Sequence, residues 1–324
     1  MTTLVQSNYD VDENPELHNA FKRYSHFLPG IADALTVPQL DADSLTQEEF
    51  IRDWVSRNRA CLVKGAVRSW PAGKKWKNKE YWKIACDNFE ITAYPHENYN
   101  NPELQNRGQV KLPFHDAIDR LFSGNDRIFS MPSEPIRDSN RFAALRADIG
   151  KFKFMPTPKP PRFYEPFRFF SYKRASTAWH YHIVDETLMC QVVGSKRVIL
   201  LSSDIKNAGY ISDYLANERY LESVQFDPSI KLTPLVVDVN EGDALYIPPY
   251  WHHVVVPNDG TVGFTLACCW QSPIHILGKF SNYFVRSLYK RGFSRIGIIT
   301  IILPAIGLYA GAAYTIRKLM GRAW

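Results

Sequence analysis

The sequence predicts a mainly β domain, built as a sandwich or barrel, that follows α+β elements and precedes a hydrophobic C-terminal helix. From about Arg162 onward, short runs rich in β-branched and aromatic residues alternate with turn signals. Upstream of that point, helical and strand patterns are mixed. Near the C-terminus, the stretch from Ile296 to Ile316 carries no charged residue.

These patterns divide the chain of 324 residues into four parts. The predicted parts are an N-terminal extension (1–40), the main domain (41–273), an amphipathic basic helix (274–295) and a membrane-spanning helix (296–316). The extension holds one expected helix, around Glu16–Tyr24.

The first half of the main domain mixes helices and strands. Ser44 or Thr46 can cap a helix that runs to about Ser56, and Glu49 completes a capping box for Thr46. Further helices are expected near 78–86 and 113–122, and strands near 59–64, 90–94 and 127–131.

The second half reads as strands, because each run is short, apolar and bounded by turn residues such as Gly194-Ser195 and Glu241-Gly242-Asp243. The runs are FRFFSYKR, TLMCQVVG, KRVILLS, LVVDV, ALYIP, HHVVV and TVGFTLACC. After Pro273, apolar residues recur at helical spacing, which predicts one amphipathic helix over about 274–293.

Charge is distributed unevenly along the chain. The protein carries a formal charge of +6, but the residues from Ile274 onward contain eight Lys or Arg and no Asp or Glu. The remainder has 31 basic and 33 acidic residues, a balance of −2. The main domain therefore lacks the strongly basic composition that favours nucleic-acid binding.

The uncharged stretch Ile296–Ile316 would span roughly 32 Å as a helix, which is about the thickness of the hydrocarbon core of a bilayer. Basic residues flank it on both sides, and only eight residues follow. We expect this stretch to be a tail anchor in the mitochondrial outer membrane or the endoplasmic reticulum. Such an anchor would leave the main domain in the cytosol. The alternative is a buried core helix. Gly307 and Gly311 form a GxxxG pattern, a helix-packing face that is consistent with a homodimer.

The stretch WHYHIVDE, residues 179–186, suggests a metal site. In a strand, residues two apart share a face, so His180 and His182 point together. A third ligand is expected from GDALYIPPYWHHVVV, residues 242–256, where His252 or His253 would enter the interior of the barrel.

Together, GDALYIPPYWHHV and HYH…QVVGSKRVILL resemble the Jumonji-C (cupin-like) family of Fe(II)- and 2-oxoglutarate-dependent oxygenases, nearest to its small protein and tRNA hydroxylases. The resemblance covers roughly residues 38–272. It implies a double-stranded β-helix whose metal is held by an HxD/E…H triad, with open positions for co-substrate and oxygen.

The resemblance carries over to four residues. His180 matches the first histidine of the triad and His253 the distal one. Lys196 matches the lysine that pairs with the far carboxylate of 2-oxoglutarate, and Thr177 the hydroxyl that bonds the same carboxylate. The chain departs from the family where His182 stands in the position of the carboxylate ligand.

This departure leaves three readings. In the first, His182 ligates directly and gives a three-histidine site. In the second, one extra residue before Gln191 bulges the strand and brings Asp185 or Glu186 into the carboxylate position. In the third, the site has lost its metal. The resemblance accordingly implies either a hydroxylase using Fe(II) and 2-oxoglutarate or a catalytically inactive binding module. For a hydroxylase, we expect a protein side chain as substrate more than tRNA.

Overall fold

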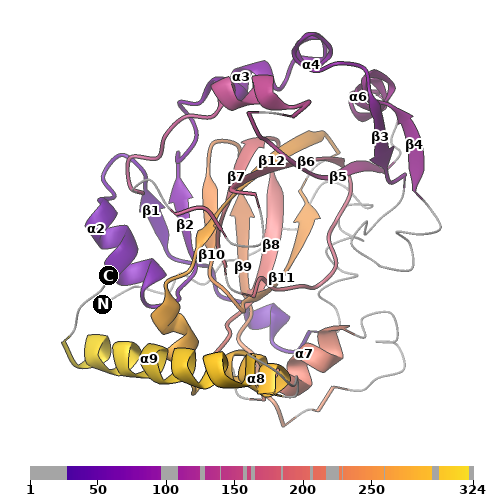
Figure 1. Cartoon of the computed structure of the whole chain (residues 1–324). Helices are drawn as coiled ribbons and strands as arrows, with labels where there is room; N and C mark the ends of the chain where they lie inside the picture. Colours follow the sequence, from indigo (N-terminus) through magenta and orange to yellow (C-terminus); the bar gives the residue numbers. More distant parts are fainter. Residues whose placement is uncertain are drawn as a thin grey trace.

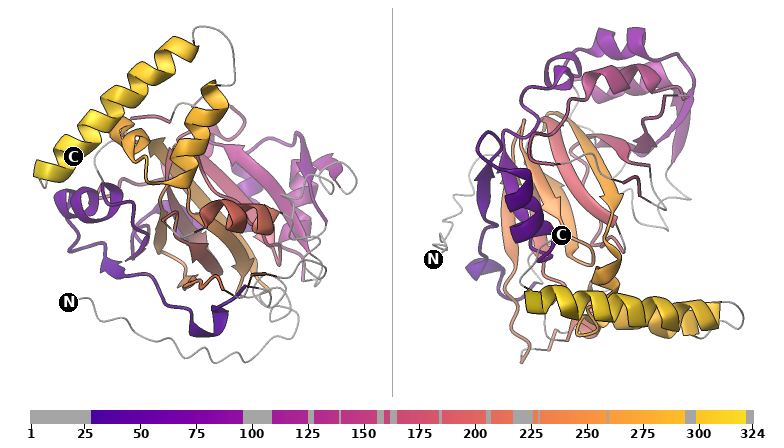
Figure 2. Two further views of the ribbon diagram at one scale, coloured as in Figure 1. Left: turned by 90° about the horizontal axis from the view of Figure 1, so that it is seen from below. Right: turned by 60° about the vertical axis from the view of Figure 1, so that its left-hand side comes forward.

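The computed structural model of the chain describes residues 28–95, 109–124, 128–138, 140–155, 159–161, 165–183, 185–204, 207–216, 226–227, 229–258, 260–293 and 299–320. The helix predicted around Glu16–Tyr24 lies outside them. Two β-sheets form the centre of the molecule (Figure 1). Helices α3, α4 and α6 lie at one end of the sheets, and α7, α8 and α9 at the opposite end (Figures 1 and 2).

The larger sheet has seven strands in the order β1-β2-β10-β7-β12-β6-β5. Their bounds are β1 Gln39–Asp41, β2 Cys61–Lys64, β10 Ala244–Ile247, β7 Asp185–Val193, β12 Val262–Gln271, β6 Phe167–Lys173 and β5 Phe129–Pro135. The smaller sheet is β11-β8-β9, with β11 His252–Pro257, β8 Lys196–Leu201 and β9 Leu235–Val239. The predicted mainly β, jelly-roll architecture is confirmed.

The remaining elements are helical or peripheral. A separate pair joins β3 Glu90–Ala93 to β4 Val110–Pro113. The helices are η1 Ile31–Asp33, α2 Gln47–Glu49, η2 Phe50–Val55, α3 Pro71–Lys75, α4 Lys79–Ala85, α6 Phe114–Leu121, η3 Ala143–Asp148, α7 Ala208–Ala216, η5 Ile274–Gly278, α8 Tyr283–Phe293 and α9 Ile299–Met320.

Strand β7 separates two apolar clusters, because alternate residues point to opposite faces of the sheet. Leu188 and Cys190 belong to the large outer cluster, whereas Met189 packs with Val198 and Leu200 between the sheets. All nine residues of β7 are buried. The face that each β7 side chain occupies is therefore firmly determined, since a one-residue slip would exchange the two sets.

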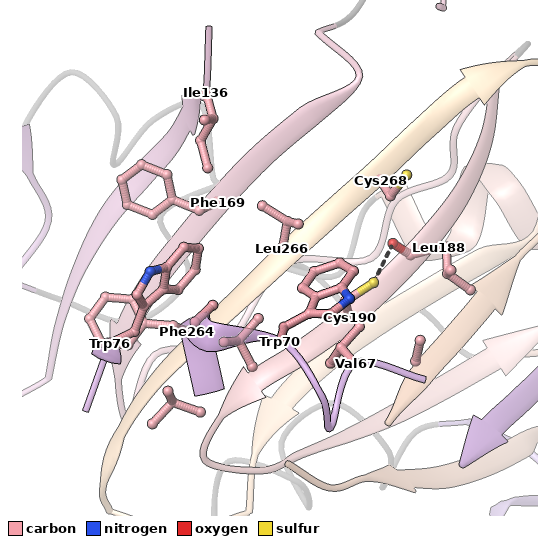
Figure 3. Close-up of a cluster of buried hydrophobic side chains, with 14 of the residues drawn as sticks. Val67, Trp70, Trp76, Ile136, Phe169, Leu188, Cys190, Phe264, Leu266 and Cys268 are labelled. Carbon is pink, nitrogen blue, oxygen red and sulfur yellow. Dashed lines mark hydrogen bonds between the residues drawn. The ribbon is translucent and has the colours of Figure 1, made fainter. Parts of the chain in front are cut away.

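The outer cluster fixes the N-terminal half against the larger sheet. Trp70 and Trp76 flank α3 and pack on sheet residues that include Phe169, Cys190 and Phe264 (Figure 3). The ring centroids of Trp76 and Phe264 are 6.0 Å apart. This wall of aromatic side chains buries the outer face of β7.

Polar side chains set the local boundaries. The hydroxyl of Thr46 accepts the N–H of Glu49 at 3.1 Å, which confirms the predicted cap and is worth about 1 kcal/mol. Asp243, in the turn before β10, accepts the N–H of Gly65 at 2.9 Å and pairs with Lys64. The Gly-Asp turn thus ties the start of the histidine-bearing segment to β2.

The single helix predicted over 274–293 is wrong in part. The structure has the short η5, a break, and then α8. The side chain of Asn282 accepts the N–H groups of Phe284 at 2.9 Å and Val285 at 3.3 Å. A new helix begins there because the asparagine caps it.

The membrane-spanning helix expected at Ile296–Ile316 is not supported. Among the helices in the described part of the chain, none combines the length and apolar character needed to cross a bilayer. Residues 296–298 of the expected span lie outside the described residues. Helix α9 instead packs along η5, where a Cβ on Gly278 would lie 2.2 Å from the carbonyl oxygen of Ala310.

The GxxxG face of α9 is used within the chain. A Cβ on Gly307 would meet the ring of Tyr289 at 3.2 Å, and a Cβ on Gly311 would meet the ring of Phe280 at 2.9 Å. The close approach that these glycines permit therefore serves packing against the chain's own C-terminal segment.

Candidate metal centre

Two segments far apart in the sequence meet edge to edge. His180 and His253 form an antiparallel bridge in which the N–H of His180 donates to the carbonyl of His253 at 3.1 Å and the reverse bond is 2.8 Å. The N–H of Thr177 donates to the carbonyl of Val255 at 2.9 Å, and the N–H of Tyr250 to that of His182 at 2.7 Å. Backbone hydrogen bonds thus hold the two segments in register.

Three imidazoles converge at this junction. One ligand atom each from His180, His182 and His253 lies within 4.8 Å of the other two. The ring centroids of His180 and His253 are 4.1 Å apart, and those of His182 and His253 are 4.9 Å apart. A metal about 2.1 Å from each nitrogen needs nitrogens no more than about 4.2 Å apart, so small ring movements close the site.

Each ring is held through its Nδ1 atom. In His180, Nδ1–H donates to the carbonyl of Ala178 at 2.8 Å, and in His253 Nδ1–H donates to the carbonyl of Trp251 at 3.0 Å. A carbonyl oxygen only accepts, so in the neutral rings the proton is on Nδ1 and Nε2 keeps its lone pair. His182 Nδ1 lies 2.8 Å from the hydroxyl of Thr187. Metal-ligating histidines commonly donate from the other ring nitrogen in this way, and the Thr187 hydroxyl can accept such a bond from His182.

Burial keeps the three rings neutral. Desolvation lowers the pKa of His182 to about 3 and lowers the pKa of His180. The pKa of His253 falls well below its usual value because the ring is buried and lies beside the other two histidines. At neutral pH the cluster therefore offers lone pairs, not positive charge.

Glu186, one of the two alternative carboxylate ligands, does not lie in the group of potential ligands formed by the three histidines. It lies on the outer face of β7, where it accepts hydrogen bonds from Tyr246 at 2.5 Å and Ser272 at 2.9 Å. Burial raises its pKa to about 7. The register shift in the pairing of β7 with β12 lies between Phe264 and Thr265, at the end of β7 away from Glu186.

Asp185 is buried on the same face of β7 as Thr187, because the two residues are two apart. Nevertheless, the group of potential metal ligands found among the described residues consists of the three histidines alone. The geometry therefore favours the three-histidine reading over the reading in which Asp185 or Glu186 ligates.

Lys196 lies inside the same barrel. It begins β8, and alternation along the strand places its side chain on the same face as that of Leu200. Leu200 is the cross-strand partner of His253, so this face is also the face of His253. The residue is 7% exposed, and its Nζ lies 3.9 Å from the centroid of the Tyr172 ring. Burial lowers its pKa to about 7. Within the described residues no carboxylate pairs with it.

Two further residues singled out in the sequence, Thr177 and His252, have different surroundings. The hydroxyl of Thr177 accepts the N–H of Val255 at 3.0 Å and retains its own proton for donation. His252 is buried on the opposite face, with Nε2 3.3 Å from the hydroxyl of Ser212, and is not part of the histidine group. The contact of Tyr172 with Lys196 could not be predicted from the sequence, since nothing in the spacing of the two residues indicates it.

Comparison with known proteins assigns most of the chain to a family. The Cupin-like domain family matches residues 46–274. Jumonji C domain-containing protein 5 of Drosophila melanogaster is 28% identical over 249 residues, covering 72% of this chain and 60% of that protein. tRNA wybutosine-synthesizing protein 5 of Gallus gallus is 27% identical over 283 residues, covering 77% of this chain and 82% of that protein.

Lysine-specific demethylase JMJ30 of Arabidopsis thaliana is 23% identical over 262 residues, covering 74% of this chain and 56% of that protein. The chain thus spans less than two thirds of two of these relatives. The matched region contains every residue of the histidine cluster as well as Lys196 and Thr177. The protein therefore belongs to the cupin-like, Jumonji-C family.

Proposed function

We propose that the protein is a 2-oxoglutarate-dependent oxygenase with a three-histidine iron centre. His180, His182 and His253 would hold Fe(II), which when bound supplies the reductive activation of oxygen that is coupled to decarboxylation of the co-substrate. The overall reaction converts 2-oxoglutarate, oxygen and a substrate C–H into succinate, carbon dioxide and a C–OH group.

The chain's own residues position the co-substrate. The Lys196 ammonium forms a charge-assisted hydrogen bond with the far carboxylate of 2-oxoglutarate, and the Thr177 hydroxyl donates to the same group. The barrel interior around Lys196 is apolar, with Val198, Leu200 and Val255 in one cluster, so water is excluded from that ion pair. A buried lysine with no carboxylate partner among the described residues is the observation that best supports a dicarboxylate ligand.

Replacing the usual carboxylate by His182 changes the charge at the metal. Three neutral imidazoles leave the full 2+ charge of the ion, whereas a two-histidine, one-carboxylate site leaves about one unit less. A dianionic co-substrate is therefore attracted more strongly to this centre than to one with a carboxylate. We infer that the substitution is compatible with co-substrate binding.

The substrate class is part of the proposal. Among curated relatives, one is named for tRNA wybutosine synthesis and another, of Homo sapiens, as a bifunctional peptidase and lysyl hydroxylase, 38% identical over 59 residues. The balance of −2 outside the C-terminal segment favours a protein side chain over tRNA.

An anaerobic titration tests the proposal. The full chain is loaded with Fe(II) and then titrated with 2-oxoglutarate while the visible charge-transfer band is recorded. Oxygen is then admitted and succinate is measured. We expect the band and succinate formation, and both should be lost in His253→Ala. Absence of both from the unaltered protein contradicts the proposal.

The second candidate is a catalytically inactive binding module. The histidine at position 182, in place of the carboxylate, is the observation that favours it. His182→Asp separates the two functions. An inactive natural protein that gains succinate formation through this one change would be a family member that has lost catalysis, and the oxygenase proposal would then be abandoned.

A further inference from the structure

Helix α8 contacts the histidine-bearing segments although it lies beyond the matched family domain. The family match ends at residue 274, and α8 begins at Tyr283. The helix lies below the smaller sheet in the view of Figure 1, next to α7. A C-terminal addition to the domain therefore lies at the end of the barrel where the three histidines meet.

Phe284 makes this contact. The residue is 5% exposed, and its ring centroid lies 4.9 Å from that of Tyr181 and 5.3 Å from that of His252. Tyr181 stands between His180 and His182, and His252 immediately precedes His253. A single aromatic ring thus packs against both segments that carry the cluster.

The same ring supports an unfavourable backbone conformation. Tyr250 has φ of 66°, in the left-handed region that side chains other than glycine rarely occupy. Its N–H donates to the carbonyl of His182 at 2.7 Å, which links the two segments directly. The Phe284 ring lies 5.8 Å from the Tyr250 ring and nearly parallel to it, at 2°. Such conformations persist only where surrounding structure holds them.

Phe284 is itself held in place from several sides. The side chain of Asn282 caps α8 and donates to the carbonyl of Ser203, just after β8, at 3.3 Å. The Tyr289 hydroxyl donates to the carbonyl of Leu277 at 3.0 Å. The position of the ring is therefore tied to both the barrel and η5.

We propose that Phe284 is a positioning residue: it packs Tyr181, Tyr250 and His252 together and so sets the mutual geometry of His180, His182 and His253. The inference deepens the proposed function and rests on it for its metal. Phe284 acts through its neighbours, because its ring contacts the residues beside the ligands and none of the three histidines.

Two matched variants of the full chain test the proposal. Phe284→Leu removes the flat ring and keeps an apolar side chain, and Phe142→Leu makes the same change in the outer cluster, where Phe142 is fully buried beside Phe169. Co(II) is the probe, with its affinity measured by calorimetry and its coordination by the visible absorption spectrum.

We expect Phe284→Leu to weaken Co(II) binding about tenfold and to shift the Co(II) spectrum, as the loss of an outer contact at a metal site does. Phe142→Leu should lower the melting temperature and leave both metal readouts unchanged. The inference is overturned if Phe284→Leu binds Co(II) with the affinity and spectrum of the unaltered protein.

Further measurements separate this inference from the proposed function. If Phe284→Leu does not fold, Tyr181→Leu is tested in its place. It removes the contact between the Phe284 and Tyr181 rings at the residue that is partly exposed, and it should weaken Co(II) binding by the same tenfold. If the unaltered protein binds no Co(II), the metal centre is refuted. The inference is then decided by NMR of the three imidazoles in the metal-free protein, whose shifts must change in Phe284→Leu and stay unchanged in Phe142→Leu.

Discussion

The two polar ends of the barrel interior differ in how their buried groups are satisfied. At one end, the Nδ1 atoms of His180, His182 and His253 all have hydrogen-bond partners, and burial keeps the rings neutral. At the other end, Lys196 is buried with its ammonium over the face of Tyr172, and no carboxylate among the described residues pairs with it. The histidine end thus presents neutral nitrogen donors, whereas the lysine end presents a cation that no carboxylate of the described residues pairs with.

The contrast shows how one barrel can bind two kinds of ligand. Neutral imidazoles with fixed orientation cost little to bury, and their free Nε2 atoms suit a cation. A buried ammonium is costly without a partner, so its burial becomes favourable only when an anion arrives. The proposed binding of a metal at one end and of a carboxylate at the other rests on this difference.

The largest expected effect comes from removing one ligand. His253→Ala should reduce Co(II) affinity by about 100-fold or more, because two imidazoles cannot hold the ion as three do. Calorimetric titration measures the affinity. His115→Ala, in the distant helix α6, is the control and should bind Co(II) normally. Equal affinity in the two variants would contradict the three-histidine site.

Lys196→Met tests the other end. We expect 2-oxoglutarate to bind about 10-fold to 100-fold more weakly, since a hydrogen bond to a charged group is worth about 1.5–3 kcal/mol. Co(II) affinity should not change, and the ligand-free protein should melt at a higher temperature because an unpaired buried charge has been removed. Lys153→Met, on the surface, serves as control. Unchanged 2-oxoglutarate affinity would remove Lys196 from the site.

Proton linkage distinguishes the two ends further. With the pKa of Lys196 at about 7 in the folded protein and 10.5 as the ordinary value, the unfolded chain binds more protons between these pH values. The stability of the ligand-free protein should therefore rise with pH across this window through Lys196, and this increment should be missing in Lys196→Met.

The same shift predicts proton uptake when 2-oxoglutarate binds. At about pH 8.5 the free lysine is mostly neutral and must be protonated to pair with the carboxylate, so affinity falls up to tenfold for each pH unit above the free pKa. Calorimetry in two buffers of different ionisation enthalpy measures the uptake. A zero uptake at pH 8.5 would mean that Lys196 is already charged.

The smallest effect is expected at Thr187. Thr187→Val removes the hydroxyl beside Nδ1 of His182 and should weaken Co(II) binding about tenfold. Ser272→Ala, which removes a donor to Glu186 on the opposite face of β7, should not alter Co(II) affinity. If the two variants behave alike, the two faces of β7 are not functionally distinct.

The strands and the candidate residues could be predicted because their signals are local. The runs around β7, β8, β10, β11 and β12 are short, apolar and bounded by turns, and two of these strands, β8 and β11, carry Lys196 and His253. His180 lies before β7 and pairs with His253 through an isolated bridge. The fate of Glu186 could not be predicted. It depends on which face of β7 the N-terminal aromatic wall covers, and that wall is more than a hundred residues away along the chain.

The C-terminal segment shows the same limit from the other side. An uncharged stretch over Ile296–Ile316 predicted a membrane span, and its two glycines predicted a packing face for another helix. Composition describes how apolar a helix is, but it does not say which surface of the same chain will cover it. In the structure, Gly278, Phe280 and Tyr289 contact the helix along the face of Gly307, Ala310 and Gly311. Other apolar residues of the helix, such as Leu308 and Tyr309, are exposed.

The sequence by itself determined the jelly-roll class, the family and the residue types available for chemistry, because periodicity, turn residues and motif spacing act over a few neighbours. Only the tertiary structure decided that three histidines converge, that Glu186 faces away from them and that Phe284 packs against the residues beside them. Those outcomes depend on contacts between segments tens of residues apart or more, where packing and burial decide which side chains can meet.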